Sequence, residues 1–172
     1  HEELVSVEKE KYFHGITYGV NLFYMKADNM IQTVAKKNVN TGELENWGAE
    51  AELLWTIKEH WGISTNHSWL HQENKLVSVP TYKGYLGVDW YSKKHKWMAS
   101  VGLQQLAGLY TAVGKNEQKE NVTLLNATVK YNINKYISLW AKGENLLAQE
   151  YEILAGYPMP KATAMGGVKV SF

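Results

Sequence analysis

Apolar and polar residues alternate one by one along almost the whole chain. In residues 45–57 the odd positions are mostly apolar, from Trp47 to Ile57, whereas Glu50 and Glu52 stand at even positions. A period of two is typical of β-strands with one apolar and one polar face, because successive side chains point to opposite sides. The same period recurs in 61–71, 82–91, 97–107, 123–131, 136–144 and 167–172, and a further strand is expected near 15–27. The sequence therefore predicts an all-β, antiparallel fold of about eight strands.

The connections between these strands are alternately short and long. The short ones lie near Glu59 and His60, at 92–95 and at 132–135. The long ones are 28–44, 72–81, 109–121 and 145–161. In an up-and-down meander, strict alternation puts every short turn at one end of the sheet and every long loop at the other. Transmembrane β-barrels sort their connections in this way, so the sequence predicts a fold of the transmembrane β-barrel type.

The composition narrows the class of protein. The 172 residues carry 18 Lys and no Arg against 17 acidic residues, a formal net charge of +1 that argues against a nucleic-acid-binding protein. No apolar stretch approaches the roughly 20 residues of a membrane helix. Aromatic residues gather at strand ends, with Trp61, Trp97 and Tyr136 beside short turns and Trp47, Trp69 and Tyr82 toward long loops. Two aromatic girdles, one at each bilayer interface, are expected.

Charged side chains of both signs share the polar face of the predicted strands. They are Glu50, Glu52, Lys83, Asp89, Lys130, Lys142, Glu144 and Lys169. We expect them to form a polar wall that faces the lumen of a barrel, with Lys83 or Lys58 balancing the charge of the two glutamates. The solvent-exposed face of a β-sandwich would show the same alternation, and the pattern alone does not separate the two folds.

No arrangement of residues points to catalysis or to a cofactor. His67 and His71 are four residues apart on one strand face, roughly 13 Å, which is too far to share a metal ion. Glu50 and Glu52 have the spacing of a glycosidase acid pair, but a barrel wall is the favoured interpretation. The chain lacks Cys, and its Ser residues form no nucleophile motif. We therefore expect no enzymatic activity, no cofactor and no tightly bound metal.

The last thirty residues carry a specific set of motifs. They contain Glu144-Asn145-Leu146, then Tyr151-Glu152, then Gly156-Tyr157-Pro158 with Pro160, and a final strand from Gly166 to Phe172. This segment resembles the C-terminus of TonB-dependent outer-membrane receptors. Residues 21–32 and 46–53 are similar to strands of the same family, and the likeness is closest to receptors for iron chelates and cobalamin.

The resemblance implies an outer-membrane receptor of a Gram-negative bacterium that takes up a large, scarce nutrient. Such receptors hold a plug domain inside a barrel of about 22 strands and are driven by the TonB energy-coupling protein. Residues 1–172 are then the last third of the barrel, without the plug, and alone should not transport. The resemblance also implies that Val168, Val170 and Phe172 form the barrel-assembly signal, and that outer-membrane lipid meets the apolar face.

Other interpretations remain open at this point. The strands could close as a small eight-stranded outer-membrane barrel with a structural or adhesive role, or form a barrel enzyme that acts on lipid. If they stay open, the two sheet edges invite pairing with another chain or a second copy.

Overall fold

The computed structural model describes residues 2–13, 15–27, 31–34, 37–40 and 44–171, and these form one large sheet with two small hairpins. The large sheet has the order β1-β2-β5-β6-β7-β8-β9-β10-β13, and every neighbouring pair is antiparallel. Its strands are β1 (Glu2–Phe13), β2 (Ile16–Ala27), β5 (Leu44–Ile57), β6 (Trp61–Gln72), β7 (Tyr82–Tyr91), β8 (Trp97–Ala112), β9 (Gln118–Asn132), β10 (Ile137–Glu144) and β13 (Thr163–Val170). The hairpins pair β3 (Ile31–Val34) with β4 (Lys37–Asn40) and β11 (Glu152–Leu154) with β12 (Tyr157–Pro158).

The predicted all-β meander is confirmed. The large sheet has nine strands where about eight were expected, because residues 2–13 pair along their full length with β2. No helix in the described part of the chain is long and apolar enough to cross a membrane.

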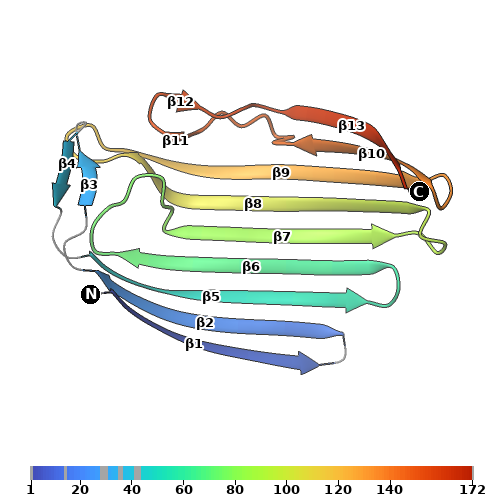
Figure 1. The fold of residues 1–172 in the computed structure, drawn as a ribbon, viewed down its shortest axis with the longest axis horizontal. Coiled ribbons are helices and arrows are strands. Elements are labelled where there is room, and N and C mark those ends of the chain that lie inside the picture. Colours follow the sequence, from blue (N-terminus) through green and yellow to red (C-terminus); the bar gives the residue numbers. More distant parts are fainter. Residues whose placement is uncertain (1, 14, 28–30, 35–36, 41–43, 172) are drawn as a thin grey trace.

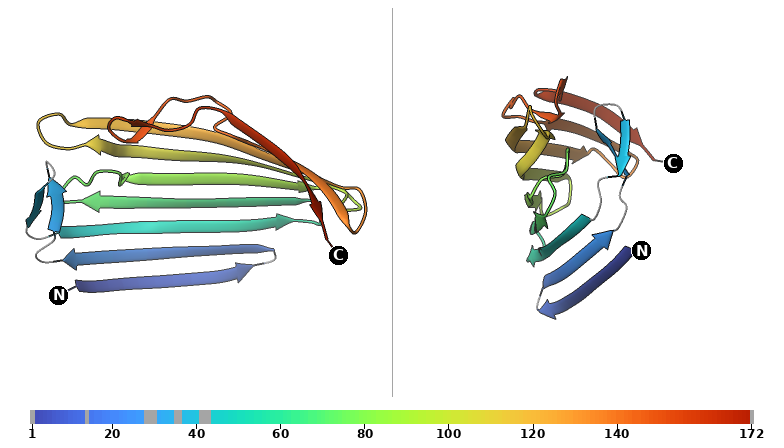
Figure 2. Two further views of the ribbon diagram at one scale, coloured as in Figure 1. Left: turned by 45° about the horizontal axis from the view of Figure 1, so that its top comes forward. Right: turned by 90° about the vertical axis from the view of Figure 1, so that its left-hand side faces the viewer.

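Short turns and long loops lie at opposite ends of the sheet (Figure 1). One connection differs from the expectation: β8 and β9 continue through most of 109–121, and only the five residues 113–117 join them. These two strands are the longest of the sheet, so their turn still reaches the end where the long loops gather (Figure 2). The connections 28–43 and 145–162 contain the small hairpins β3–β4 and β11–β12.

The sheet curves into an open trough when viewed along its strands (Figure 2). In the described residues its edges are β1 and β13, which do not pair with one another, so the expected alternative of a closed small barrel is not formed. The sandwich alternative also fails, because large apolar side chains stay exposed on one face: 56% for Leu22 and 47% for Val101. A sandwich would bury this face against a second sheet.

A bulge in β8 changes which side chains face the polar side. Leu106 pairs with Val122 and Leu109 with Glu120, so between these pairs β8 has two residues, 107 and 108, where β9 has only residue 121. Leu109 therefore lies on the same face as Val122. At the bulge Gly108 has φ +67°, and a Cβ there would lie 2.0 Å from the hydroxyl oxygen of Thr81. Leu109 and Val122 are the two fully buried apolar side chains among the described residues, and the buried core is thus small and lies near the loop end.

Candidate functional site

The strand register places the predicted wall residues on one face of the sheet. Glu50 pairs with Ser68, which pairs with Lys83 across β6. Asp89 pairs with Ser100, and Ser100 pairs with Thr128. Directly paired residues share a face, and the face repeats every second residue. This rule, applied to every paired residue, places all the charged residues predicted for the wall on the same side of the sheet. They are Glu50, Glu52, Lys83, Asp89, Lys130, Lys142, Glu144 and Lys169.

An acidic hollow of about 360 Å³ lies on this polar face across β2, β5 and β6. Glu50 and Glu52 line it together with Asn21, Asn66 and Ser68. The Asn21 amide donates to one Glu50 oxygen at 3.3 Å, and the Ser68 hydroxyl donates to the other at 3.5 Å. Neutral groups thus contact the Glu50 carboxylate.

The expected charge balance by a neighbouring lysine is wrong for the described side chains. Lys83 stands two strands from Glu50, and within the described part of the chain the ion pairs join Lys75, Lys142 and Lys161 to other carboxylates. Lys58 follows the end of β5 at φ 54° and does not line the hollow. The two glutamates therefore present net negative charge toward whatever faces the wall.

The opposite face is apolar and carries aromatic rings near both ends. Toward the loop end, Trp47 stacks on His71 with ring centroids 4.9 Å apart, and Trp69 lies 5.6 Å from Tyr82. Toward the short turns, Trp97 lies 4.4 Å from Tyr131 across β8 and β9. Trp61 also stands at the short-turn end, opposite Trp90. Tyr136, predicted for the same girdle, is 51% exposed in the last short turn but lines a hollow of the polar face together with Ser138. Two aromatic layers thus border a band of Leu, Val and Ala, and of the six rings that the sequence predicts for them only Tyr136 lies on the other side.

His67 has both ring nitrogens engaged on this apolar face. The Tyr82 hydroxyl lies 2.7 Å from Nδ1, and the Thr65 hydroxyl lies 2.8 Å from Nε2 and donates to the Tyr85 carbonyl at 2.8 Å. These contacts leave His67 no nitrogen for a metal ion. In the described part of the chain, no group of three or more His, Asp or Glu could hold one.

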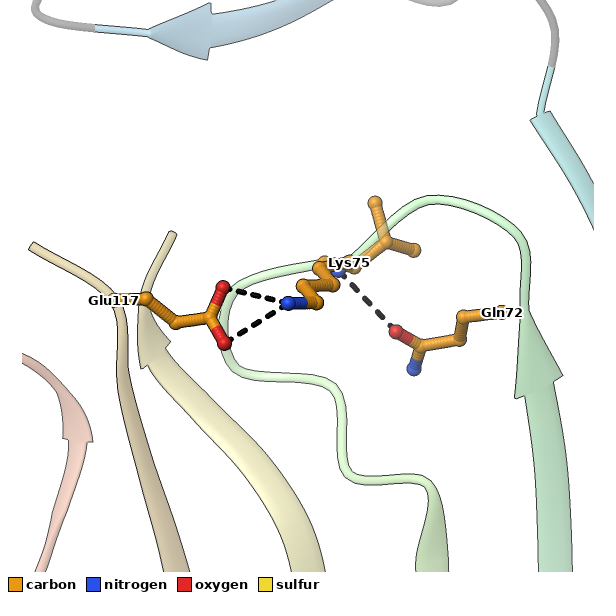
Figure 3. A network of polar contacts seen from close by, with 4 residues as sticks. Gln72, Lys75 and Glu117 are labelled. Carbon is orange, nitrogen blue, oxygen red and sulfur yellow. Dashed lines mark hydrogen bonds and ion pairs between the residues drawn. The ribbon is translucent and has the colours of Figure 1, made fainter. Parts of the chain in front are cut away.

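A polar network holds the 73–81 loop against the β8–β9 turn (Figure 3). The Lys75 ammonium group donates to both oxygens of Glu117, at 2.9 and 2.7 Å, and lies 5.2 Å from the centre of the Tyr110 ring. The hydrogen bond to the Glu117 carboxylate raises the pKa of Lys75 above its ordinary value. The Leu76 backbone donates to the Gln72 amide oxygen at 3.2 Å and fixes the start of the loop.

The 145–162 connection folds back over β9. Asn145 is 5% exposed and has φ 48°, a left-handed conformation that asparagine tolerates better than most residues. Its amide nitrogen donates to the carbonyls of Gln149 and Pro160, at 2.8 and 3.1 Å. The Gln149 side chain in turn accepts from the Thr123 backbone at 2.6 Å. Asn145 from the recognised motif is therefore a structural clamp, whereas Gln149 carried no sequence signal that could have singled it out.

Two ionisable groups of this connection are shifted by their surroundings. An ion pair with Lys161 lowers the pKa of the Glu150 carboxyl. Burial raises the pKa of the Tyr151 hydroxyl, and the charge of Glu144 adds to this effect. Tyr157, from the same motif region, is 68% exposed.

The predicted assembly residues lie on the edge strand β13. Val168 pairs with Leu139 and Val170 with Ile137, so both belong to the apolar face and are more than half exposed. Phe172 lies outside the described residues. Whether these residues act as an assembly signal stays a prediction.

Comparisons with known proteins agree with this geometry. The family model described as "TonB dependent receptor-like, beta-barrel" matches residues 5–146. No curated protein matches the chain. Among solved structures, the siderophore receptor PiuA from Acinetobacter baumannii has a TM-score of 0.81 at 18% identity, over 98% of this chain and 28% of its own.

Two further solved structures are similar to this chain. The ferric yersiniabactin uptake receptor FyuA from Yersinia pestis has a TM-score of 0.79 at 15% identity, over 99% of this chain and 30% of its own. A mutant of the ferric enterobactin receptor PfeA from Pseudomonas aeruginosa has a TM-score of 0.78 at 16% identity, over 99% of this chain and 31% of its own. The chain thus spans about three tenths of the length of these receptors. Because the family model covers most of the sequence, the chain belongs to the TonB-dependent receptor-like β-barrel family.

Proposed function

We propose that residues 1–172 form the C-terminal part of the barrel of an outer-membrane receptor that takes up an iron chelate with energy supplied through TonB. The observation that carries the proposal is the open, two-faced sheet of a chain that belongs to this family. Three similar solved structures are named as siderophore or ferric-chelate receptors, which favours iron chelates over cobalamin. The protein acts in the outer membrane of a Gram-negative bacterium.

The two faces of the sheet have different partners in this proposal. The apolar face meets lipid, because its exposed Leu and Val lie between two aromatic layers. The polar wall faces the lumen and the plug domain, which this stretch does not contain. The Glu50 and Glu52 carboxylates meet cationic groups of the plug, because no described lysine neutralises them.

The open edges explain why this stretch should not transport alone. Within the described part of the chain, the backbone groups on the outer sides of β1 and β13 have no strand partner, and an unpaired edge is not tolerated in lipid. In the intact receptor the remaining barrel strands pair with them. No catalytic step or resident cofactor is required of this wall.

Uptake by the intact receptor tests the proposal. We expect deletion of its gene to abolish uptake of at least one radiolabelled ferric siderophore, and loss of TonB to have the same effect. A strain without TonB but with the receptor is the control that separates binding from transport. Unchanged uptake of every iron chelate that the host can use would overturn the proposal.

A further inference from the structure

A second hollow on the polar face lies beside the last short turn and is lined by lysines. It has a volume of about 90 Å³, and Lys130, Lys135 and Lys169 contribute to its lining together with Asn132 and Ser138. Among the described residues, no carboxylate side chain lines it. Its charge is therefore opposite to that of the Glu50 and Glu52 hollow.

The strand register explains why the lysines surround a hollow. Asn132, Ser138 and Lys169 stand side by side on β9, β10 and β13. Ser138 is only 7% exposed, so its short side chain forms a floor between longer neighbours. Lys130 lies two residues before Asn132 on β9 and on the same face, and strands about 4.8 Å apart bring its ammonium group within reach of an anion bound over Ser138.

One side of the hollow is shaped by an inward tryptophan. Trp140 pairs with Lys130 on one side and with Gly167 on the other. A Cβ at position 167 would lie 3.0 Å from the indole, so the ring occupies the space that glycine leaves open. The Trp140 ring thus fills the face next to the hollow, whereas the space above the short Ser138 side chain stays unfilled.

The lysines of the hollow lack an anion within the described part of the chain. Neither Lys130 nor Lys169 forms an ion pair there, whereas Lys142 on the same face is held by Glu144 at 2.5 Å. The Lys135 ammonium group lies over the Tyr136 ring, 4.7 Å from its centre. Cations gathered on a wall repel one another unless an anion lies between them.

We propose that this hollow binds an acidic side chain, aspartate or glutamate, of a polypeptide segment outside residues 1–172 that enters the lumen at the short-turn end. The inference rests on the proposed function, because it takes the polar face as the lumen wall. A carboxylate fits the charge and the small volume of the hollow and can accept from several ammonium groups at once. A lipid phosphate is disfavoured because lipid meets the other face.

Carbodiimide cross-linking of the intact receptor in outer membranes tests this directly. The reagent joins a lysine amine to a carboxylate only when the two are in contact, and mass spectrometry identifies both peptides. We expect Lys130 or Lys169 to be linked to an Asp or Glu outside residues 1–172. The link should be lost in the Lys130→Gln/Lys169→Gln variant and kept in Lys94→Gln, a control at the exposed β7–β8 turn.

The outcomes separate this inference from the proposed function. A receptor that takes up iron chelates but gives no such link, or links only to acidic residues within 1–172, would overturn the inference alone. Lipid phosphate retained by wild type and released by the double variant would overturn it as well. A receptor that gives the link but supports no uptake would leave the inference standing and remove the proposed function.

Discussion

Replacing Leu125 by lysine tests most directly which face of the sheet meets lipid. Leu125 pairs with Leu103, and Leu103 pairs with Leu86, so the three leucines form a row across the apolar face. The side chains of Leu86 and Leu103 are 46% and 40% exposed, as expected for a row covered by lipid rather than by protein.

The depth of Leu125 in the membrane follows from its place on β9. It lies six residues before Tyr131, which contacts Trp97 in the aromatic layer at the short-turn end. Six residues span roughly 20 Å along a strand, and a tilt of about 45° reduces this to roughly 14 Å along the membrane normal. In an apolar band about 25 Å tall, Leu125 is then near the midplane, and Leu125→Lys should lower the free energy of unfolding by about 2–4 kcal/mol.

Two matched variants on the same strand complete the test. Val129→Lys lies on the same face but only two residues from Tyr131, so it should cost about 1 kcal/mol or less. Thr128→Lys lies on the polar face opposite Lys142, whose charge is already held by Glu144, and should also cost about 1 kcal/mol or less. The assay is denaturant unfolding of the intact receptor in lipid vesicles. Equal costs for Leu125→Lys and Thr128→Lys would refute the assignment of the two faces.

Three further changes test other parts of the structure. Gly108→Ala and Gly156→Ala each place alanine at positive φ, which costs about 1–2 kcal/mol, but only at Gly108 does the methyl group meet another side chain, so its denaturation midpoint should fall further; equal midpoints would contradict this. Glu117 raises the pKa of Lys75, so their ion pair stabilises the loop at any pH below the ordinary lysine pKa of about 10.4 and is lost as the pH rises through the raised pKa. Amide hydrogen exchange in the 73–81 loop should then increase more steeply with pH than in a Glu117→Gln control. The same increase in both proteins would be the contrary result. Removing Phe172 should lower the amount of intact receptor in the outer membrane without changing its synthesis, and a normal amount would speak against an assembly signal.

The sequence predicts the faces of the strands well because alternation is a property of each strand that pairing preserves. Glu50 and Lys130 are far apart in the chain and on different strands, yet their parity on each strand places both on the polar face. The meander topology preserves this assignment of faces, because each strand of the large sheet pairs with the strands before and after it in the sequence, apart from the small hairpins.

The β8 bulge shows where the same reasoning stops. Without Gly108 as an extra residue, Leu109 would lie on the apolar face, but the bulge turns it to the polar face beside Val122. The sequence 109–121 contains Gly114 followed by the unbroken polar run 115–121 and shows no regular alternation, so it predicts a long loop, although pairing with β9 extends β8 as far as Ala112. A bulge depends on the partner strand, and the partner is not visible in a local pattern.

The distribution of charge around the wall is the feature that local sequence patterns are least able to predict. Alternation assigns Glu52 and Lys130 to the same face but says nothing of the distance between them, because that distance depends on how many strands separate β5 from β9. Once the strand order is known, the two glutamates lie in one hollow and the unpaired lysines in another, with β7 and β8 between them. The carboxylates and the lysines are too far apart to neutralise one another directly, because at physiological salt the interaction between exposed charges is largely screened beyond about 8 Å. Under the proposal that this face lines the lumen, a segment that fills the lumen has to bring positive charge to β5 and negative charge to β9–β13, and this pattern fixes its orientation as well as its affinity.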